Sequence, residues 1–157
     1  MDNGLQLWDI VKGECSKELP LKHKDPITCL DLSGNATSVV SSSYSSDGMV
    51  STLILWDLRK QDDIVQEIGV TGEVKAIKFD AAGQYLAVAL KDRTELHYFE
   101  SKTTLGLLAT FPTVPNVAAL SWGTDAKYLV TSGFDRRVTL LQAATEDSHA
   151  AKRQKLN

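Results

Sequence analysis

The stretch Ile27–Leu32, I-T-C-L-D-L, sets a frame of apolar residues that the chain repeats twice. The frame returns as V-K-A-I-K-F at Val74–Phe79 and as V-A-A-L-S-W at Val117–Trp122. A second apolar segment follows each of the three, at Val39, Leu86 and Leu129. A third segment then ends at Trp56-Asp57, Phe99-Glu100 and Leu141-Gln142. We therefore expect one unit of short strands to occur three times.

The spacing of these units indicates their architecture. Their equivalent positions Leu32, Phe79 and Trp122 are 47 and 43 residues apart. A period in the low forties, short alternating strands and a Trp-Asp ending are typical of a β-propeller blade. A chain of 157 residues holds three to four blades of roughly 42 residues each. The sequence thus predicts an all-β partial propeller, and it favours recognition as the function because propellers mostly present loop surfaces.

The order of the segments predicts where the repeat is incomplete. Residues 4–9 read as the third strand of a blade and residues 15–19 as its outer strand, without the first two strands. The last unit ends at its third strand, so we predict a repeat segment over residues 1–142 and a flexible polar tail over residues 143–157. This order is expected of the C-terminal piece of a longer protein whose ring closes with a strand from an N-terminal segment. The serine-rich run at residues 41–48 predicts a long, exposed and mobile loop.

The composition argues against several classes of function. The formal charge is -3, from 17 basic and 20 acidic side chains, which provides no field that would hold nucleic acid through its phosphates. The apolar runs are far shorter than the ~18 residues of a membrane span, and Asp2 and Asp9 argue against a signal peptide. Cys15 and Cys29 form no C-x-x-C pair, which argues against zinc or a disulfide framework. We expect an intracellular protein without direct membrane or nucleic-acid contact.

The chain lacks the short motifs of catalysis and cofactor binding. It has no G-x-S-x-G elbow, no phosphate-binding glycine loop and no H-E-x-x-H. Its Ser, His and Asp residues fall at repeat positions with a structural explanation, and His97 is expected to face outward from a strand. We predict no catalytic, cofactor-binding or metal-binding residues.

One face of the predicted ring carries the loops that leave second strands and the loops that enter first strands. Mixed charge around an exposed aromatic residue suits protein recognition, although a plain solvated rim would have the same composition. The partner-binding residues expected on this face are Lys22, Lys24, Lys91, Arg93, Phe134, Arg136 and Arg137, interspersed with Asp25, Asp92 and Asp135.

The pairs Trp8-Asp9 and Trp56-Asp57 resemble those of WD40 repeats, and His23 stands where that family has a Gly-His dipeptide. A buried indole N–H needs an acceptor, and a buried imidazole needs partners for both nitrogens. The two later units lack the His, and they have Phe99 and Leu141 in place of the Trp. The resemblance implies a buried hydrogen-bond network in one blade, made of His23, Ser42, Asp47 and Trp56.

Three phrases carry a closer resemblance, L-W-D-L-R-K at 55–60, F-D-A-A-G-Q-Y-L-A at 79–87 and K-Y-L-V-T-S-G-F-D-R at 127–136. In this order they resemble the C-terminal blades of the pre-mRNA-processing factor nineteen family, spliceosomal ubiquitin ligases. The resemblance implies a nuclear homotetramer in which a U-box recruits the conjugating enzyme, a coiled coil joins the subunits, and a seven-bladed propeller binds splicing-complex subunits and ubiquitination substrates. This segment would be the part that binds substrates and partners, and no residue of the ligase module is implied in it.

A second interpretation fits the same residues. The chain could serve as a generic WD40 scaffold subunit of another intracellular complex, with no link to ubiquitin. A U-box and heptads encoded upstream would favour the ligase. In the tail, residues 152–155 (K-R-Q-K) have the form of a short basic nuclear-import signal, or they are only a solvated chain end.

Overall fold

The computed structural model describes residues 4–60, 64–101, 104–112 and 117–142. In these residues thirteen strands form four antiparallel sheets, and in each sheet the strands pair in chain order. None of the described residues forms a helix long and apolar enough to cross a bilayer. The tail predicted over residues 143–157 lies outside the described part of the chain.

The four sheets correspond to the four predicted sets of strands. The first sheet pairs β1 (Leu5–Asp9) with β2 (Glu14–Leu19). The second contains β3 (Ile27–Leu32), β4 (Ser38–Ser45), β5 (Val50–Asp57) and β6 (Ile64–Thr71). The third contains β7 (Val74–Phe79), β8 (Tyr85–Leu90), β9 (Arg93–Ser101) and β10 (Thr104–Pro112). The fourth contains β11 (Val117–Trp122), β12 (Tyr128–Gly133) and β13 (Val138–Gln142).

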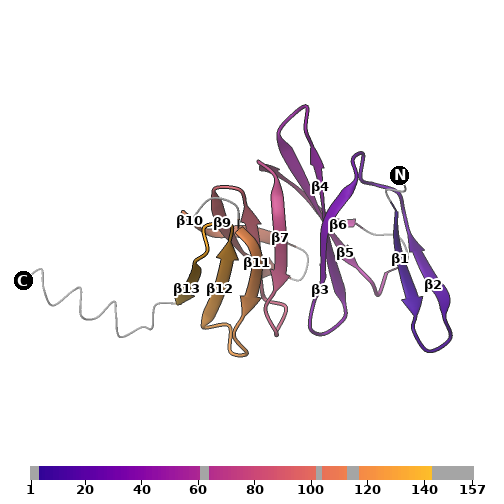
Figure 1. Ribbon diagram of the computed structural model, residues 1–157. Coiled ribbons are helices and arrows are strands. Elements are labelled where there is room, and N and C mark those ends of the chain that lie inside the picture. Colours follow the sequence, from indigo (N-terminus) through magenta and orange to yellow (C-terminus); the bar gives the residue numbers. More distant parts are fainter. Residues whose placement is uncertain (1–3, 61–63, 102–103, 113–116, 143–157) are drawn as a thin grey trace, which may run out of the picture.

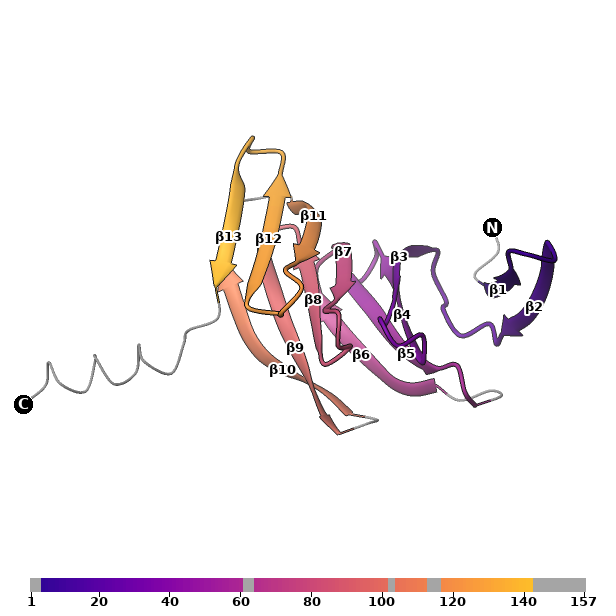
Figure 2. The same ribbon diagram turned by 90° about the horizontal axis from the view of Figure 1, so that it is seen from below.

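The sheets lie side by side in chain order (Figures 1 and 2). β3 contacts β7 and β7 contacts β11, so the first strands of successive sheets are neighbours. The turns that join first to second strands lie at the lower end in Figure 1, and the β4–β5 hairpin lies at the upper end. The prediction of an all-β partial propeller is confirmed. The first sheet contains only a third strand and an outer strand, and each of the next three sheets contains a first, a second and a third strand. The number of blades in a complete ring stays a prediction.

A bulge explains the apolar frame that marks each first strand. In β3, β7 and β11 the pairing register shifts directly after the first residue, between Ile27 and Cys29, Val74 and Ala76, and Val117 and Ala119. The extra residue brings positions i, i+3 and i+5 to the same face of the sheet. In β7 these are Val74, Ile77 and Phe79, and all three are buried.

The core lies between the sheets. The larger cluster joins the second sheet, through Val40, Leu53 and Leu55, to the apolar face of β7 and β8. The smaller cluster joins Leu5 and Leu7 of the first sheet to Trp56 of the second. A fully buried large apolar side chain contributes about 1.5–3 kcal/mol, so each sheet depends on the neighbour that covers its face.

The cross-strand register corrects one predicted equivalence. Val39 pairs with Trp56, and Leu86, the equivalent of Val39, pairs with His97. His97 therefore holds the position of Trp56, and the prediction that Phe99 does so is wrong by two residues. His97 is also 3% exposed, so the expected outward orientation is wrong. The reason is the β8–β9 turn, which contains only residues 91–92 between its strands.

The run at residues 41–48 is not a long loop. β4 continues to Ser45 and β5 begins at Val50, which leaves a turn over residues 46–49. Ser41, Ser42 and Ser43 are buried. The extra residues of this unit lengthen a hairpin, and its serines fill positions between sheets.

Candidate functional site

The candidate site is the set of loops at the upper end of the strands in Figure 1, which we call the loop face. It comprises residues 20–26, 46–49, 72–73, 91–92 and 134–137. Lys22, Lys24, Lys91, Phe134, Arg136 and Arg137 are exposed there, as the sequence pattern implied. Arg93, the seventh residue expected on this face, is half-buried.

A buried network fixes the first of these loops. His23 is 6% exposed, and its two ring nitrogens lie 2.7 Å from the hydroxyl oxygens of Ser43 and Ser41. The Trp56 indole N–H donates to Ser41 Oγ at 2.8 Å. All these groups are paired when the Ser41 hydroxyl donates to Nε2 of His23, and Nδ1–H donates to Ser43. Burial lowers the pKa of His23, which favours this neutral ring.

The network differs from the predicted one in two members. Ser42 points to the opposite face of the sheet from Ser41, and its buried hydroxyl has no partner among the described residues. Asp47 lies in the exposed turn, where its carboxylate accepts a bond from Ser46 at 3.4 Å. Ser41 and Ser43 take the expected places because alternate residues of β4 face the loop that carries His23. The network therefore holds the backbone between Lys22 and Lys24 against the second sheet.

Arg93 anchors the loop face across two sheets. Its guanidinium donates to the Thr71 carbonyl of β6 at 2.7 Å and to Glu95 Oε1 at 2.8 Å. Glu95 lies beside His97 Nε2 at 3.2 Å, and hydrogen bonds from His97 and then from Arg93 lower the pKa of Glu95. Arg93 is thus engaged within the chain, and its part in partner binding stays a prediction.

Ser51 fixes the loop between β6 and β7. Its hydroxyl donates to the Gly72 carbonyl at 2.8 Å and accepts the Val74 amide at 3.0 Å. The Gly72 amide donates to the Met49 carbonyl at 2.7 Å. Gly72 has φ of +102°, a conformation that costs glycine little. These bonds give the middle of the loop face a defined backbone.

The β12–β13 hairpin presents the most exposed aromatic side chain of the loop face. Phe134 is 81% exposed, and Asp135 Oδ1 accepts the Arg137 amide at 3.1 Å, which closes the turn. Arg136 adopts φ of +63° at the tip. In the described part of the chain, neither Arg136 nor Arg137 forms an ion pair with its side chain. An exposed ring beside two available guanidinium groups suits an apolar and acidic protein surface.

The contact between Ser41 and His23 has the distance of a nucleophile and its base. Ser41 is fully buried, however, and its oxygen also accepts the Trp56 indole. A substrate has no access to it, so the pair is structural. The described residues contain no group of three His, Cys, Asp or Glu side chains able to hold a metal ion.

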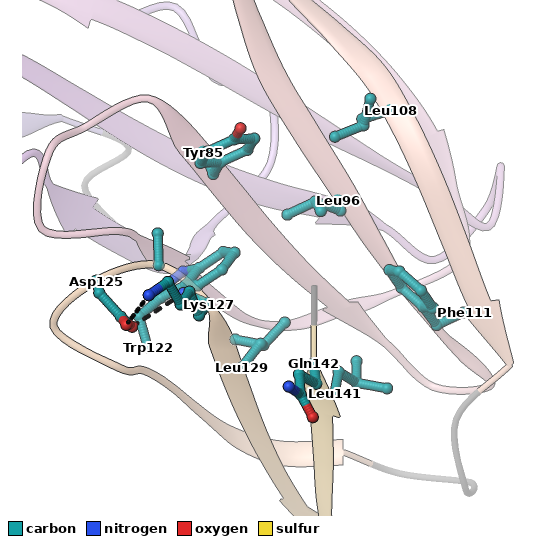
Figure 3. A pocket seen from close by; sticks show the side chains of 11 residues that line it. Tyr85, Leu96, Leu108, Phe111, Trp122, Asp125, Lys127, Leu129, Leu141 and Gln142 are labelled. Carbon is teal, nitrogen blue, oxygen red and sulfur yellow. Dashed lines mark hydrogen bonds and ion pairs between the residues drawn. The ribbon is translucent and has the colours of Figure 1, made fainter. Parts of the chain in front are cut away.

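A second feature is an apolar pocket of about 270 Å³ between the third and fourth sheets (Figure 3). Leu96, Leu108 and Phe111 line it from the third sheet, and Leu129 and Leu141 line it from the fourth. An ion pair of Lys127 with Asp125, at 3.4 Å, lies beside it. Sequence reasoning missed this pocket because only the packing of two sheets brings its residues together. Its lining suits an apolar side chain better than a polar cofactor.

The comparisons with known proteins agree with this geometry. The WD40 family (WD domain, G-beta repeat) matches residues 13–52, which run from the end of the β1–β2 turn into β5 and include His23, Ser41 and Ser43 of the network but not Trp56. This match, together with the four meander sheets, shows WD40-type repeat structure in the chain.

The chain has distant similarity to pre-mRNA-processing factor 19. It is 27% identical over 148 residues to the protein of that name from Oryza sativa subsp. japonica, which covers 91% of this chain and 27% of the relative. It is 24% identical over 139 residues to pre-mRNA-processing factor 19 homolog 2 of Arabidopsis thaliana, 87% of this chain and 25% of the relative. The chain spans about a quarter of the length of the curated relatives it matches.

Proposed function

We propose that this chain is a protein-recognition segment that binds its partners through the loop face. The observation that carries the proposal is Phe134, 81% exposed on a closed turn beside Arg136 and Arg137. Exposing a large aromatic side chain has an energetic cost that a partner surface removes, and aromatic and arginine residues dominate binding energy at interfaces. The bonds of His23 and Arg93 pre-order the neighbouring loops, which reduces the entropy lost on binding.

The likeness to pre-mRNA-processing factor 19 supports a more specific assignment. In this proposal the segment recruits splicing-complex subunits and ubiquitination substrates to a nuclear ubiquitin ligase, whose catalytic module is a different part of the protein. A generic WD40 scaffold in another complex is the second candidate, and it is favoured by the fact that the family match itself covers only residues 13–52.

Site-specific cross-linking tests both assignments. A photoreactive phenylalanine analogue at position 134, in protein expressed in cells, is expected to cross-link to a small set of proteins, with splicing factors among them. The same analogue at Val11, which is 92% exposed on the β1–β2 turn, serves as the control. Equal products from both positions would refute the loop face as a binding site. A specific product without splicing factors or ligase substrates would favour the scaffold.

A further inference from the structure

A polar groove lies at the end of the molecule opposite the loop face. It has a volume of about 310 Å³ and lies between the second and third sheets, at the end of the turns that join first to second strands (Figure 1). Asn35 of the β3–β4 turn and Arg59, just after β5, line it from the second sheet, and Gln84 and Tyr98 line it from the third. Both sheets are four-stranded and lie inside the row of sheets, so the groove is a property of the repeats themselves.

Arg59 is held in one orientation by Asp57. Its Nε and Nη2 donate to the two carboxylate oxygens of Asp57 at 2.8 and 2.7 Å. The carboxylate of Asp57 is 7% exposed, whereas the Arg59 side chain is 60% exposed. A guanidinium has five N–H donors, and Asp57 occupies only one edge of it. The edge formed by Nη1 and the second hydrogen of Nη2 has no partner among the described residues, so it is available to a ligand in the groove.

Asn35 provides a second fixed donor. Its Oδ1 accepts hydrogen bonds from the Ser33 hydroxyl at 2.8 Å and from the amide and hydroxyl of Thr37 at 3.0 and 2.7 Å. Because the Thr37 amide can only donate, these bonds fix which atom of the Asn35 side chain is the oxygen. Nδ2 lies 3.9 Å from the position that a Cβ of Gly83 would take, on the side of the third sheet. It donates to no acceptor in the part of the chain that the structure describes.

These two donors define the chemistry of a ligand. Among the described residues that line the groove, Arg59 is the one charged side chain, and both free groups donate and cannot accept. The two oxygens of a carboxylate match the edge of a guanidinium. A phosphate monoester carries a charge of about −2, which one arginine already paired with Asp57 does not neutralise. The groove therefore fits a carboxylate better than a phosphate.

We propose that this groove binds an aspartate or glutamate side chain from an acidic segment of a protein partner. The carboxylate accepts hydrogen bonds from the free edge of Arg59 and from Asn35 Nδ2, and the rings of Tyr98 and Phe99 pack against the methylene groups of the same side chain. The site is separate from the loop face, so one chain can bind at both ends of its strands at the same time.

Titration of the isotope-labelled whole chain, followed by nuclear magnetic resonance, tests this proposal. The probe is a short alanine-based peptide, blocked at both ends, with one central glutamate. It is expected to shift the signals of the Arg59 Nε–H and of the Asn35 side-chain amide. The same peptide with glutamine in place of glutamate is expected to bind more weakly by about tenfold or more, and the peptide with phosphoserine is also expected to bind more weakly.

Three variants complete the test. Asn35→Asp retains the oxygen that holds the β3–β4 turn but replaces the free donor by an acidic oxygen, so it should abolish binding. Arg59→Lys retains the charge beside Asp57 but has no second edge, so the affinity should fall by about tenfold or more. Lys12→Gln is the control, because it removes an exposed cation from the β1–β2 turn, outside the groove, and its affinity should not change. The spectrum of each variant shows whether it is folded.

Several outcomes would overturn the proposal. These are an absence of shifts at Arg59 and Asn35, shifts confined to the loop face, equal affinity for the glutamine peptide, and tighter binding of the phosphoserine peptide. Equal losses in Lys12→Gln and Arg59→Lys would also refute it, because the peptide would then respond only to net charge. Cross-linking from position 134 reports on the loop face alone, so the two binding sites are tested separately.

Discussion

Replacing Trp56 by alanine tests the network that holds the loop face. Trp56 is 2% exposed, in a cluster with Leu19 and Ile54. Truncation of a buried tryptophan costs about 3–5 kcal/mol through the cavity that it leaves. Part of this cost is the loss of the indole N–H that donates to Ser41 Oγ, because the buried oxygen is left without that donor. A total of ~3–5 kcal/mol is a large part of the ~5–15 kcal/mol that stabilises a typical domain.

Urea denaturation followed by far-ultraviolet circular dichroism measures this loss. Phe99→Leu is the matched control, because Phe99 is only half-buried and the change conserves most of the volume, so we expect less than about 1.5 kcal/mol. Ser41→Ala removes the hydroxyl alone and is expected to cost about 1–3 kcal/mol. Small and equal effects of Trp56→Ala and Phe99→Leu would refute the assignment of Trp56 to a buried network.

Three further predictions concern pH and backbone packing. Burial lowers the pKa of His23 from 6.5, so below about pH 6.5 the unfolded chain binds more protons than the folded chain does. Acidification should therefore lower the melting temperature in this range, and it should lower that of His23→Gln by less. The hydrogen bond from Arg59 lowers the pKa of Asp57 from 3.8 to about 2. Its contribution should be complete above about pH 4 and vanish as the pH falls toward 2, and Asp57→Asn should lack this dependence in acid titrations followed by circular dichroism. In Gly34→Ala the new Cβ would collide with the Ala81 carbonyl oxygen, so we expect a loss of about 1–3 kcal/mol by urea denaturation, and an unchanged midpoint would contradict that packing.

The first strands could be located from the sequence to the residue. Their spacing of i, i+3 and i+5 can be recognised within one short segment, because a bulge after the first residue brings these three positions to one face. Ile27–Leu32, Val74–Phe79 and Val117–Trp122 have the predicted bounds for this reason. Third strands were less predictable, since their register depends on the length of the hairpin before them.

Two errors show this dependence on the partner strand. The sequence predicts that His97 faces outward from its strand, but the short β8–β9 turn places it opposite Leu86 on a buried face. The polar serine run predicts a loop that begins at Ser41, yet the Ser41 hydroxyl accepts the indole N–H of Trp56. Ser41 is buried with a partner, Trp56, that is 15 residues away in the sequence. His97 is buried because of the register between β8 and β9. No local pattern contains that information.

The exposure of most of the predicted surface residues could be inferred from the sequence, but that of Arg93 could not. Exposure of Lys22, Lys91 and Phe134 follows from their place in short turns, and the structure has them exposed. Arg93 directly follows such a turn, but it reaches the Thr71 carbonyl of the neighbouring sheet. Only the packing of two sheets creates that acceptor, so the sequence pattern alone could not separate Arg93 from the exposed cations.

The substitution of His97 for tryptophan has a consequence for how such repeats diverge. In the second sheet, Ser41 forms hydrogen bonds with both the Trp56 indole and the His23 imidazole. Its equivalent in the third sheet is Val88, which has no hydroxyl. His97 instead bonds to Glu95 of its own strand, and its Nδ1 is buried without a partner among the described residues. Restoring one member of a lost polar network strands that member, at about 1–3 kcal/mol, so reversion requires several changes at once. Replacing His97 alone by tryptophan would therefore leave the new indole N–H without the serine acceptor that Trp56 has, and the network requires both changes together.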